Sequence, residues 1–243
     1  MPRFFIAGTN LAGGRAILKG RDAEHVRVLR LRVGEDVTIC DGQGTDYKCR
    51  LVYADKEQAE AEVLEVVPCP AEPSVKVTVL CGLPKGDKTD YIIQKCVEAG
   101  AGEIAFFLSD RCVARPEEPE KKLERWQRIA EEAAKQSGRG VIPRVSWAGD
   151  LAGALDAAVK TELPLFLYET GEREGLDTVL DANKSVRTAA IITGPEGGFE
   201  EYEAKLARSC GLHVCSMGER ILRCETAPVV ALTAAMYATG NLS

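Results

Sequence analysis

The sequence predicts a small β-rich domain followed by a larger α/β domain built on a parallel sheet. The boundary is marked by three prolines within six residues, Pro68, Pro70 and Pro73. Proline prevents helix and interrupts a sheet ladder, so residues 67–73 are interpreted as a short, stiff linker. At about 150 residues per domain, 243 residues suffice for one large domain or two small ones. We therefore expect domains at residues 1–72 and 73–243.

Short strand-like segments fill the second half of the N-terminal domain. Residues 36–40, 47–53 and 61–67 are rich in Val, Ile, Tyr and Thr, and turn signals lie at 41–44 and 54–56. Several short strands joined by turns are typical of a barrel or a curled sheet. The N-terminal domain is therefore predicted to be one of these two.

Apolar strands alternate with helices after the linker. Residues 75–83 predict a strand, 87–98 a helix and 103–108 a second strand, which together form a βαβ unit. Asp87 is a candidate N-cap and Gly100 can end the helix. Because βαβ units join parallel strands, a parallel sheet is expected.

The remaining elements continue this alternation. A helix at 120–136 has Trp126 on its apolar side, and its basic side is expected to be free for a partner. A closing helix is predicted at about 228–239, with Thr226 as N-cap and Pro228 at its first position. Three further strands are predicted at 164–168, 189–193 and 213–217.

Composition excludes several classes of protein. A hydrophobic fraction of 45% with 28% charged residues predicts a packed core. No apolar run approaches the roughly 20 residues that span a bilayer, and the first residues lack the apolar region of a signal peptide. We expect a cytoplasmic protein without membrane contact. The nine cysteines form no C-x-x-C pair and there are only two histidines, so we expect reduced thiols and no metal site.

Charge is distributed unevenly. The net charge of -6 argues against a protein that coats DNA through phosphate neutralisation. However, residues 1–32 hold seven basic against two acidic side chains, and residues 111–144 hold nine against six. The two basic stretches indicate a confined nucleic-acid footprint. Solvated surface charge is an equal alternative.

A glycine-rich turn, residues 194–198, follows the predicted strand at 189–193. In open α/β sheets ligands bind at the carboxyl ends of strands, and glycines let a ligand approach the backbone. The turn lacks both the Lys-Ser/Thr of a phosphate-binding P-loop and G-x-G-x-x-G spacing. Glu196, Glu200 and Glu201 would repel an anion but tolerate a neutral or cationic ligand. The alternative is a tight turn without a ligand.

A second loop, residues 215–228, also connects a strand to a helix. Arg220 and Arg223 could bind a phosphate or polarise a carbonyl, and Glu225 could accept a proton or fix an arginine. The alternative is a surface ion pair beside a helix cap. If the two strands are neighbours, both loops form one crevice.

Together, residues 193–198 (Thr-Gly-Pro-Glu-Gly-Gly) and 218–227 closely resemble the RsmE family of 16S ribosomal RNA (uracil-N3)-methyltransferases, in the SPOUT superfamily. The resemblance covers nearly all of the chain. Supporting segments are Arg3-Phe4-Phe5 and residues 25–30, 85–88, 94–100 and 125–133.

This resemblance implies a fold, a cofactor and partners. The expected fold is a PUA-like β-barrel that contacts RNA, followed by a SPOUT-type parallel α/β domain tied in a trefoil knot, which periodicity alone could not predict. The expected cofactor is S-adenosylmethionine, bound in the knot near the interface of a homodimer. The expected substrate is 16S rRNA in the small ribosomal subunit.

The resemblance also implies roles for individual residues. The RNA-binding residues would include Arg3, Arg27 and Arg30, with a contribution from residues 121–144. Arg27 and Arg30 would share a face if that segment is helical. The cofactor would be bound by Leu167, Thr193, Gly194, Pro195, Glu196, Gly197, Gly198, Met217, Gly218, Ile221, Leu222 and Arg223.

The implied reaction transfers a methyl group from the sulfonium to N3 of a uridine. Arg223 would stabilise negative charge on a uracil carbonyl oxygen, and Glu225 is the candidate base or orients Arg223. The sequence departs from the family pattern at two places. Where the family commonly has Leu-Gly-Pro-Arg, residues 217–220 are Met-Gly-Glu-Arg, so Met217 and Glu219 differ, and Cys224 replaces a common threonine. A role for that threonine hydroxyl is therefore not transferred, and Cys224 is expected to be a packing thiol.

Two other functions remain open at this point. A related SPOUT enzyme would methylate RNA but yield a different nucleoside. A non-catalytic RNA-binding or ribosome-assembly factor would keep the fold, bind the cofactor weakly and tolerate loss of Arg223 and Glu225. A P-loop nucleotide hydrolase is excluded by the missing Gly-Lys-Ser/Thr.

Overall fold

The computed structural model describes residues 2–6, 11–115, 118 and 120–242. The chain forms two compact units. The first unit holds Met1–Glu72 together with Ala134–Ile142, and the second holds Pro73–Ala133 and Pro143–Ser243. The chain therefore enters the first unit twice, a feature that the linker prolines could not predict.

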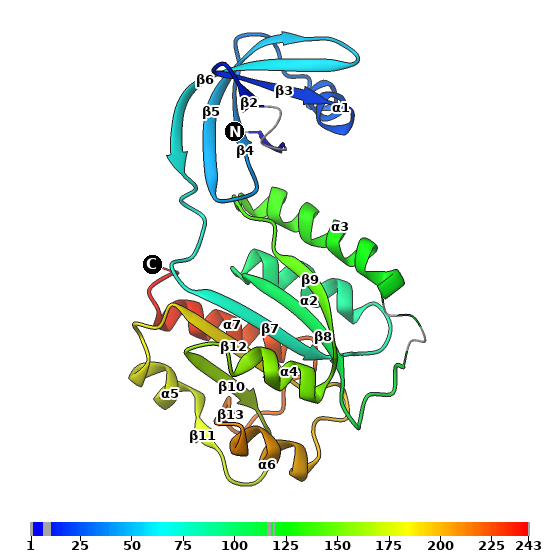
Figure 1. The fold of residues 1–243 in the computed structure, drawn as a ribbon, viewed down its shortest axis with the longest axis vertical. Coiled ribbons are helices and arrows are strands. Elements are labelled where there is room, and N and C mark those ends of the chain that lie inside the picture. Colours follow the sequence, from blue (N-terminus) through cyan, green and yellow to red (C-terminus); the bar gives the residue numbers. More distant parts are fainter. Residues whose placement is uncertain (1, 7–10, 116–117, 119, 243) are drawn as a thin grey trace. The chain divides into compact units, whose positions relative to one another are not determined.

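A curled, mixed sheet forms the first unit (Figure 1). Its strand order is β1-β4-β5-β6-β3-β2, in which β1 is parallel to β4 and the other pairs are antiparallel. The predicted strands correspond to β4, β5 and β6, whereas β1 to β3 and α1 were not predicted. The bounds are β1 (Arg3–Phe5), β2 (Leu11–Ala12), β3 (Arg15–Lys19), α1 (Arg21–Val28), β4 (Asp36–Cys40), β5 (Thr45–Ala54) and β6 (Gln58–Pro68).

Arg3 is a structural residue of this unit. Its Nη1 and Nη2 each lie 2.7 Å from a carboxylate oxygen of Asp46, whose side chain is 0% exposed. Nη1 also lies 3.3 Å from the carbonyl oxygen of Arg139. The Arg3 side chain is itself only 13% exposed, because Asp46 needs a cation inside the fold. This pairing gives Arg3 a structural role, and its expected contact with RNA stays a prediction.

Glu72 ties the segment 134–142 to the rest of the first unit. Its carboxylate accepts a hydrogen bond from Arg139 Nη2 at 2.8 Å and from the backbone amides of Gly140 and Val141 at 2.8 and 3.0 Å. Partial burial acts to raise the pKa of Glu72, but these hydrogen bonds and the Arg139 charge hold it below its ordinary value.

A seven-stranded parallel sheet forms the second unit, as the βαβ pattern predicts. Its order is β11-β13-β10-β12-β7-β8-β9. The strands are β7 (Lys76–Gly82), β8 (Glu103–Leu108), β9 (Arg144–Asp150), β10 (Leu163–Leu167), β11 (Glu174–Gly175), β12 (Thr188–Thr193) and β13 (His213–Ser216). The helices are α2 (Lys88–Glu98), α3 (Glu120–Ser137, from Ala134 on in the first unit), α4 (Leu151–Ala158), α5 (Leu176–Ala182), α6 (Glu201–Ser209) and α7 (Ala227–Ala238).

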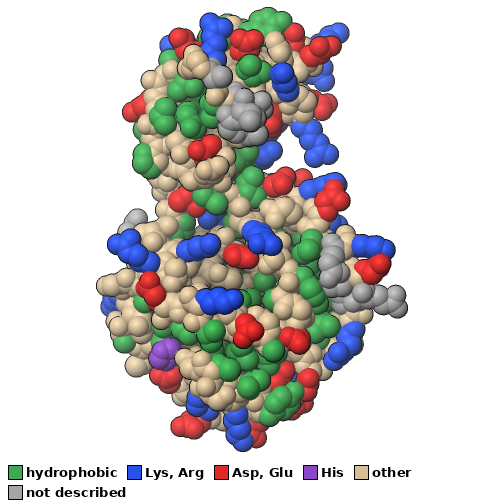
Figure 2. Space-filling model, in the orientation of Figure 1, with side chains coloured by type: hydrophobic (Ala, Val, Ile, Leu, Met, Phe, Trp, Pro, Cys, Tyr) green, Lys and Arg blue, Asp and Glu red, His purple; other side chains and the backbone are tan. Residues whose placement is uncertain are grey.

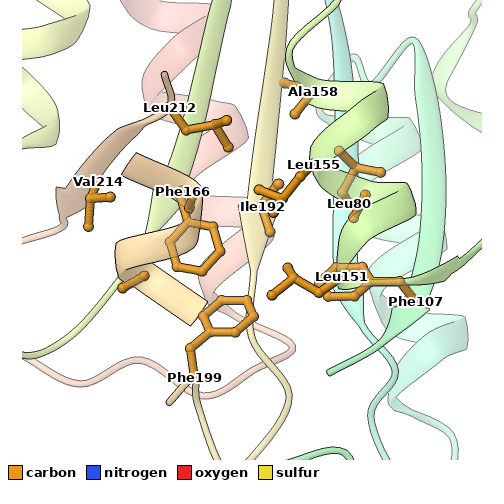
Figure 3. Packing of buried hydrophobic residues seen from close by; sticks show 14 of the residues in the cluster. Leu80, Phe107, Leu151, Leu155, Ala158, Phe166, Ile192, Phe199, Leu212 and Val214 are labelled. Atoms are coloured by element: carbon orange, nitrogen blue, oxygen red, sulfur yellow. The ribbon is translucent and has the colours of Figure 1, made fainter. Parts of the chain in front are cut away.

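Helices cover both faces of this sheet (Figure 1). On one face, Leu151 and Leu155 of α4 pack over Phe107 and Ile192 of the central strands (Figure 3). The alternate residues of β12 face α7, which lies beside β7 and β12. Both faces of the central strands are thus buried, which explains why they are continuous apolar runs.

Two predicted helix caps are not formed. Asp87 occupies the N-cap position of α2 and Thr226 that of α7, but neither side chain makes a capping hydrogen bond. Pro228 is at the second position of α7 rather than the first, because the helix begins at Ala227. Asp150 caps α4 instead, accepting from the Gly153 amide at 3.0 Å.

The basic side of α3 is paired, contrary to the expectation that it is free. Arg125 binds Asp90, Arg128 binds Glu124 and Lys121 binds Glu118, while Lys135 lies 3.8 Å from Asp22. Basic and acidic side chains are also interspersed over the face shown in Figure 2.

Neither a membrane helix nor a metal cluster is found in the part of the chain that the structure describes. None of its helices is both long and apolar enough to cross a bilayer. No group of three or more His, Cys, Asp or Glu side chains in these residues could hold a metal ion.

Candidate functional site

A cleft of about 350 Å³ lies at the carboxyl ends of three adjacent strands, β13, β10 and β12. Both of the loops singled out in the sequence line it, because their strands flank β10. Its lining residues are Lys88, Leu167, Tyr168, Glu169, Thr193, Gly194, Pro195, Glu196, Gly198, Cys215, Ser216, Met217, Gly218, Glu219, Arg220, Ile221, Leu222, Arg223, Cys224 and Ala227.

The glycine loop, residues 194–198, is a tight turn that lets backbone line the cleft. The Gly198 amide donates to the Pro195 carbonyl at 3.0 Å, and Gly198 has a φ of 67°, which a side chain would strain. A Cβ at Gly194 would come within 3.2 Å of the Gly198 backbone. The loop is anchored by Phe199, whose ring centroid lies 4.3 Å from that of Phe166 in the core (Figure 3).

Arg111 braces the outer side of the glycine loop. Its guanidinium donates to both carboxylate oxygens of Glu200 at 2.7 and 2.8 Å and to the Gly197 carbonyl at 3.0 Å. A Cβ at Gly197 would lie 2.9 Å from Arg111 Cβ. Gly197 therefore packs against Arg111 and is not among the residues that line the cleft, and its predicted contact with the cofactor stays a prediction.

The arginine loop, residues 217–225, has no helix or strand of its own but is tied to the start of α7. The Arg223 carbonyl accepts from the amides of Thr226 and Ala227 at 2.8 and 2.9 Å. The guanidinium of Arg223 makes no ion pair within 4.0 Å to the described residues, and this side chain lines the cleft. An exposed, unpaired arginine at a cleft can bind an oxygen of a ligand.

Lys88, at the start of α2, connects the two loops. Its Nζ lies 2.9 Å from Glu196 Oε1 in the glycine loop and 3.4 Å from Glu225 Oε2 in the arginine loop. The hydrogen bond to Glu196 raises the pKa of Lys88, and the hydrogen bond to Glu225 acts in the same direction. Lys88 is therefore a permanent cation between two carboxylates.

Glu225 faces Lys88 rather than the cleft. Partial burial acts to raise its pKa, but hydrogen bonds from its own amide, from the Cys224 thiol at 3.2 Å and from Lys88 hold the pKa below its ordinary value. A carboxylate with a lowered pKa is a weaker base. Burial, with the bond to Glu225, raises the pKa of Cys224 to about 12, so this thiol stays protonated.

Glu196 in the glycine loop, and Glu200 and Glu201 at the start of α6, are each paired with a cation. Glu196 is paired with Lys88, Glu200 with Arg111 and Glu201 with Lys205. The expectation that these carboxylates repel an anion but tolerate a neutral or cationic ligand stays a prediction, and the structure adds that each has a cation of its own.

The structure brings together all the predicted cofactor residues except Gly197, and Arg223 lies among them. Sequence reasoning missed Lys88, Tyr168, Glu169 and Ser216, which also line the cleft. A signal was present for Lys88 in the segment 85–88. Tyr168 and Glu169 directly follow a strand whose end was already expected at the site.

The two remaining predicted RNA-binding residues are exposed in the first unit. Arg27 lies in α1, 3.8 Å from Glu24. The helix ends at Val28, and Arg30 has a φ of 56°, so Arg27 and Arg30 do not share a helical face.

Comparisons with known proteins agree with both units. The family model for an RNA methyltransferase domain matches residues 71–236, and that for an RNA methyltransferase PUA domain matches residues 18–64. Ribosomal RNA small subunit methyltransferase E of Bacillus subtilis is 34% identical over 250 residues, covering 98% of this chain and 97% of the relative.

Solved structures agree as well. The crystal structure of ribosomal RNA small subunit methyltransferase E from Neisseria gonorrhoeae bound to S-adenosyl methionine matches with a TM-score of 0.84 at 33% identity, covering 98% of this chain and 97% of that one. A structure from Legionella pneumophila in complex with the same cofactor matches with a TM-score of 0.82 at 28% identity, covering 97% of both chains.

The fold and these matches define the class as an RNA methyltransferase with an attached PUA domain. The resemblance carried by the two C-terminal motifs is thereby confirmed. The chain belongs to the ribosomal RNA small subunit methyltransferase E family.

Proposed function

We propose that this protein transfers a methyl group from S-adenosylmethionine to N3 of a uridine in 16S rRNA of the small ribosomal subunit. The observation that carries the proposal is the cleft that the glycine and arginine loops form, and a family member has been solved bound to S-adenosyl methionine.

The residues of the cleft fit this cofactor. A volume of about 350 Å³ lies within the range of small-molecule sites. Gly194 and Gly198 line the cleft without side chains, so the glycine loop presents backbone to a ligand there. Apolar contacts for an adenine ring are available from Leu167, Met217, Ile221 and Leu222, and the glycine loop offers backbone groups.

The bound cofactor supplies a methyl group activated by its sulfonium. The protein must align the uracil N3 with it and stabilise the charge that appears when N3 loses its proton, because the neutral imide nitrogen is a poor nucleophile. Arg223 is suited to this role, since its unpaired guanidinium can bind a uracil carbonyl oxygen as negative charge develops there.

Glu225 is better suited to positioning than to proton abstraction. It accepts from Lys88 and Cys224, does not line the cleft and has a lowered pKa. We therefore propose that it holds Lys88 between the loops. A Glu225→Gln variant should then raise the cofactor Kd with a modest loss of kcat and an unchanged pH profile. A kcat loss of about 10²-fold or more with an altered pH profile would restore Glu225 as the base.

The proposal includes the wider assignments of the family resemblance. Residues 1–72 would be the PUA-like RNA-binding domain and 73–243 a knotted SPOUT domain, acting in the cytoplasm as a homodimer. Sedimentation equilibrium tests the dimer, which would have twice the 26.3 kDa of one chain. A measured mass equal to that of one chain, at the concentrations of the activity assay, would contradict the proposed homodimer.

The substrate is tested by incubating the protein with methyl-labelled S-adenosylmethionine and unmodified small ribosomal subunits, then digesting the RNA. Label in 3-methyluridine supports the proposal. Label in another nucleoside keeps the class of enzyme and changes the target. No label and no cofactor binding would favour a non-catalytic RNA-binding factor.

RNA contact by the first unit is tested at Arg27 and Arg30, which remain exposed. An Arg30→Glu variant should bind RNA more weakly and with a smaller dependence on salt, since each lost phosphate contact reduces counterion release. Unchanged affinity and salt slope would remove Arg30 from the interface.

A further inference from the structure

Glu169 is an acidic residue of the cleft for which the proposed reaction has no role yet. It directly follows Tyr168 at the end of β10, the strand between the two loops. Among the described residues it makes no hydrogen bond and no ion pair within 4.0 Å, although its charge is felt by Arg111. The Arg111 guanidinium is already directed to Glu200 and the Gly197 carbonyl.

The carboxylate of Glu169 lies over the glycine loop. A Cβ built on Gly198 would fall 2.1 Å from Glu169 Oε1, so the carboxylate occupies the space that a side chain at residue 198 would need. Both residues line the cleft. Gly198 thus serves two purposes, since its φ of 67° makes the turn and its missing side chain makes room for Glu169.

The acidic residues of the cleft differ in the charge that they can offer a ligand. Glu196 shares its charge with Lys88. Glu219 is exposed in the arginine loop, directly beside Arg220 in sequence. Glu169 lies two residues after the end of β10 and packs over Gly198 of the glycine loop, and no cation within 4.0 Å neutralises it in the described structure.

We infer that Glu169 sets the preference of this cleft for the cationic methyl donor over its neutral thioether product. This inference rests on the proposed function. A fixed carboxylate stabilises a sulfonium cation, and this attraction disappears once the methyl group has left and the sulfur is neutral. In a cleft open to water, a single such interaction should amount to about fivefold in affinity. The product is then released more easily than the substrate cofactor.

The test compares two ligands that differ at the sulfur. Kd values for S-adenosylmethionine and S-adenosylhomocysteine are measured by isothermal titration calorimetry on the wild type, Glu169→Gln and the control Glu172→Gln, an exposed residue that does not line the cleft. The expected result for Glu169→Gln is a Kd for S-adenosylmethionine raised about fivefold and a Kd for S-adenosylhomocysteine changed less than twofold. The control should change both values less than twofold, and Glu169→Asp should recover part of the preference.

Other outcomes are distinguishable. An equal loss for both ligands means that Glu169 contacts a part that they share, such as the amino group, and overturns the inference. No change for either ligand also overturns it. If the wild type binds neither ligand, the proposed function itself fails. Because Glu169 is exposed, the Gln variant should melt like the wild type, and a thermal melt checks this.

Discussion

Replacing Lys88 by Met should separate the two loops that form the cleft. Lys88 Nζ makes contacts of 2.9 Å to Glu196 and 3.4 Å to Glu225, and the three side chains are 31%, 28% and 19% exposed. For such partly exposed pairs about 1 kcal/mol per contact is reasonable, giving a ceiling of about 2 kcal/mol. If the whole effect appears in binding, it corresponds to roughly a 30-fold rise in the cofactor Kd.

The assay is titration of S-adenosylmethionine into Lys88→Met, with two matched variants. Lys88→Arg keeps the cation and should recover most of the affinity. Lys95→Met removes a lysine from the same helix, where Lys95 is paired with Glu98 at 2.9 Å and does not line the cleft, so Kd should not change. Binding by Lys88→Met within twofold of the wild type would refute the reasoning that Lys88 holds the loops in place.

Three further predictions concern stability and reactivity. Arg3→Met removes the closer cation of the buried Asp46 carboxylate, leaves only Lys48 at 3.8 Å, and should lower the free energy of unfolding by about 3 kcal/mol in urea; a loss under 1 kcal/mol would contradict the assignment. Iodoacetamide at pH 8 should modify the exposed Cys210 well before Cys224, whose pKa is raised to about 12, and mass spectrometry of the native protein checks the order. The pKa of Glu72 in the folded state lies below 4.5, so the carboxylate stabilises the fold above that pH and this stabilisation is lost as the pH falls through the folded-state pKa. The difference in Tm between the wild type and Glu72→Gln should therefore shrink in acid. A difference in Tm that does not change with pH would contradict this prediction.

Local pattern predicted the strands that have two buried faces and the helices with a clear apolar stripe. Residues 189–192 of strand β12 form an uninterrupted apolar run, and α3 carries Trp126 on its buried side. The sequence did not predict α4, β2 and β11. These elements are too short to show a clear hydrophobic periodicity. Asp87 and Thr226 are good N-cap types, yet local sequence does not fix the side-chain rotamer.

The sequence also predicted only part of the chemistry of the cleft, because local sequence shows residue types but not their distant partners. Two loops with unusual residue types were recognisable, and the order of the strands brought them together. The partners of their charges were not recognisable, because Glu200 meets Arg111 and Glu225 meets Lys88 across large separations in the sequence. These distant pairings decide which carboxylate of the cleft has no neighbouring cation. The unpaired Glu169 could therefore be recognised only in the structure.

The return of residues 134–142 to the first unit has a practical consequence for dissecting the protein. A fragment that ends at Glu72 would keep this carboxylate but lose the Arg139 guanidinium and the two amides that it binds. A fragment that starts at Pro73 would expose an arginine that is 4% exposed in the intact chain. Residues 1–72 should therefore be expressed with the 134–142 segment fused to them by a flexible linker. Cutting the gene at the linker prolines would separate two segments of one folded unit.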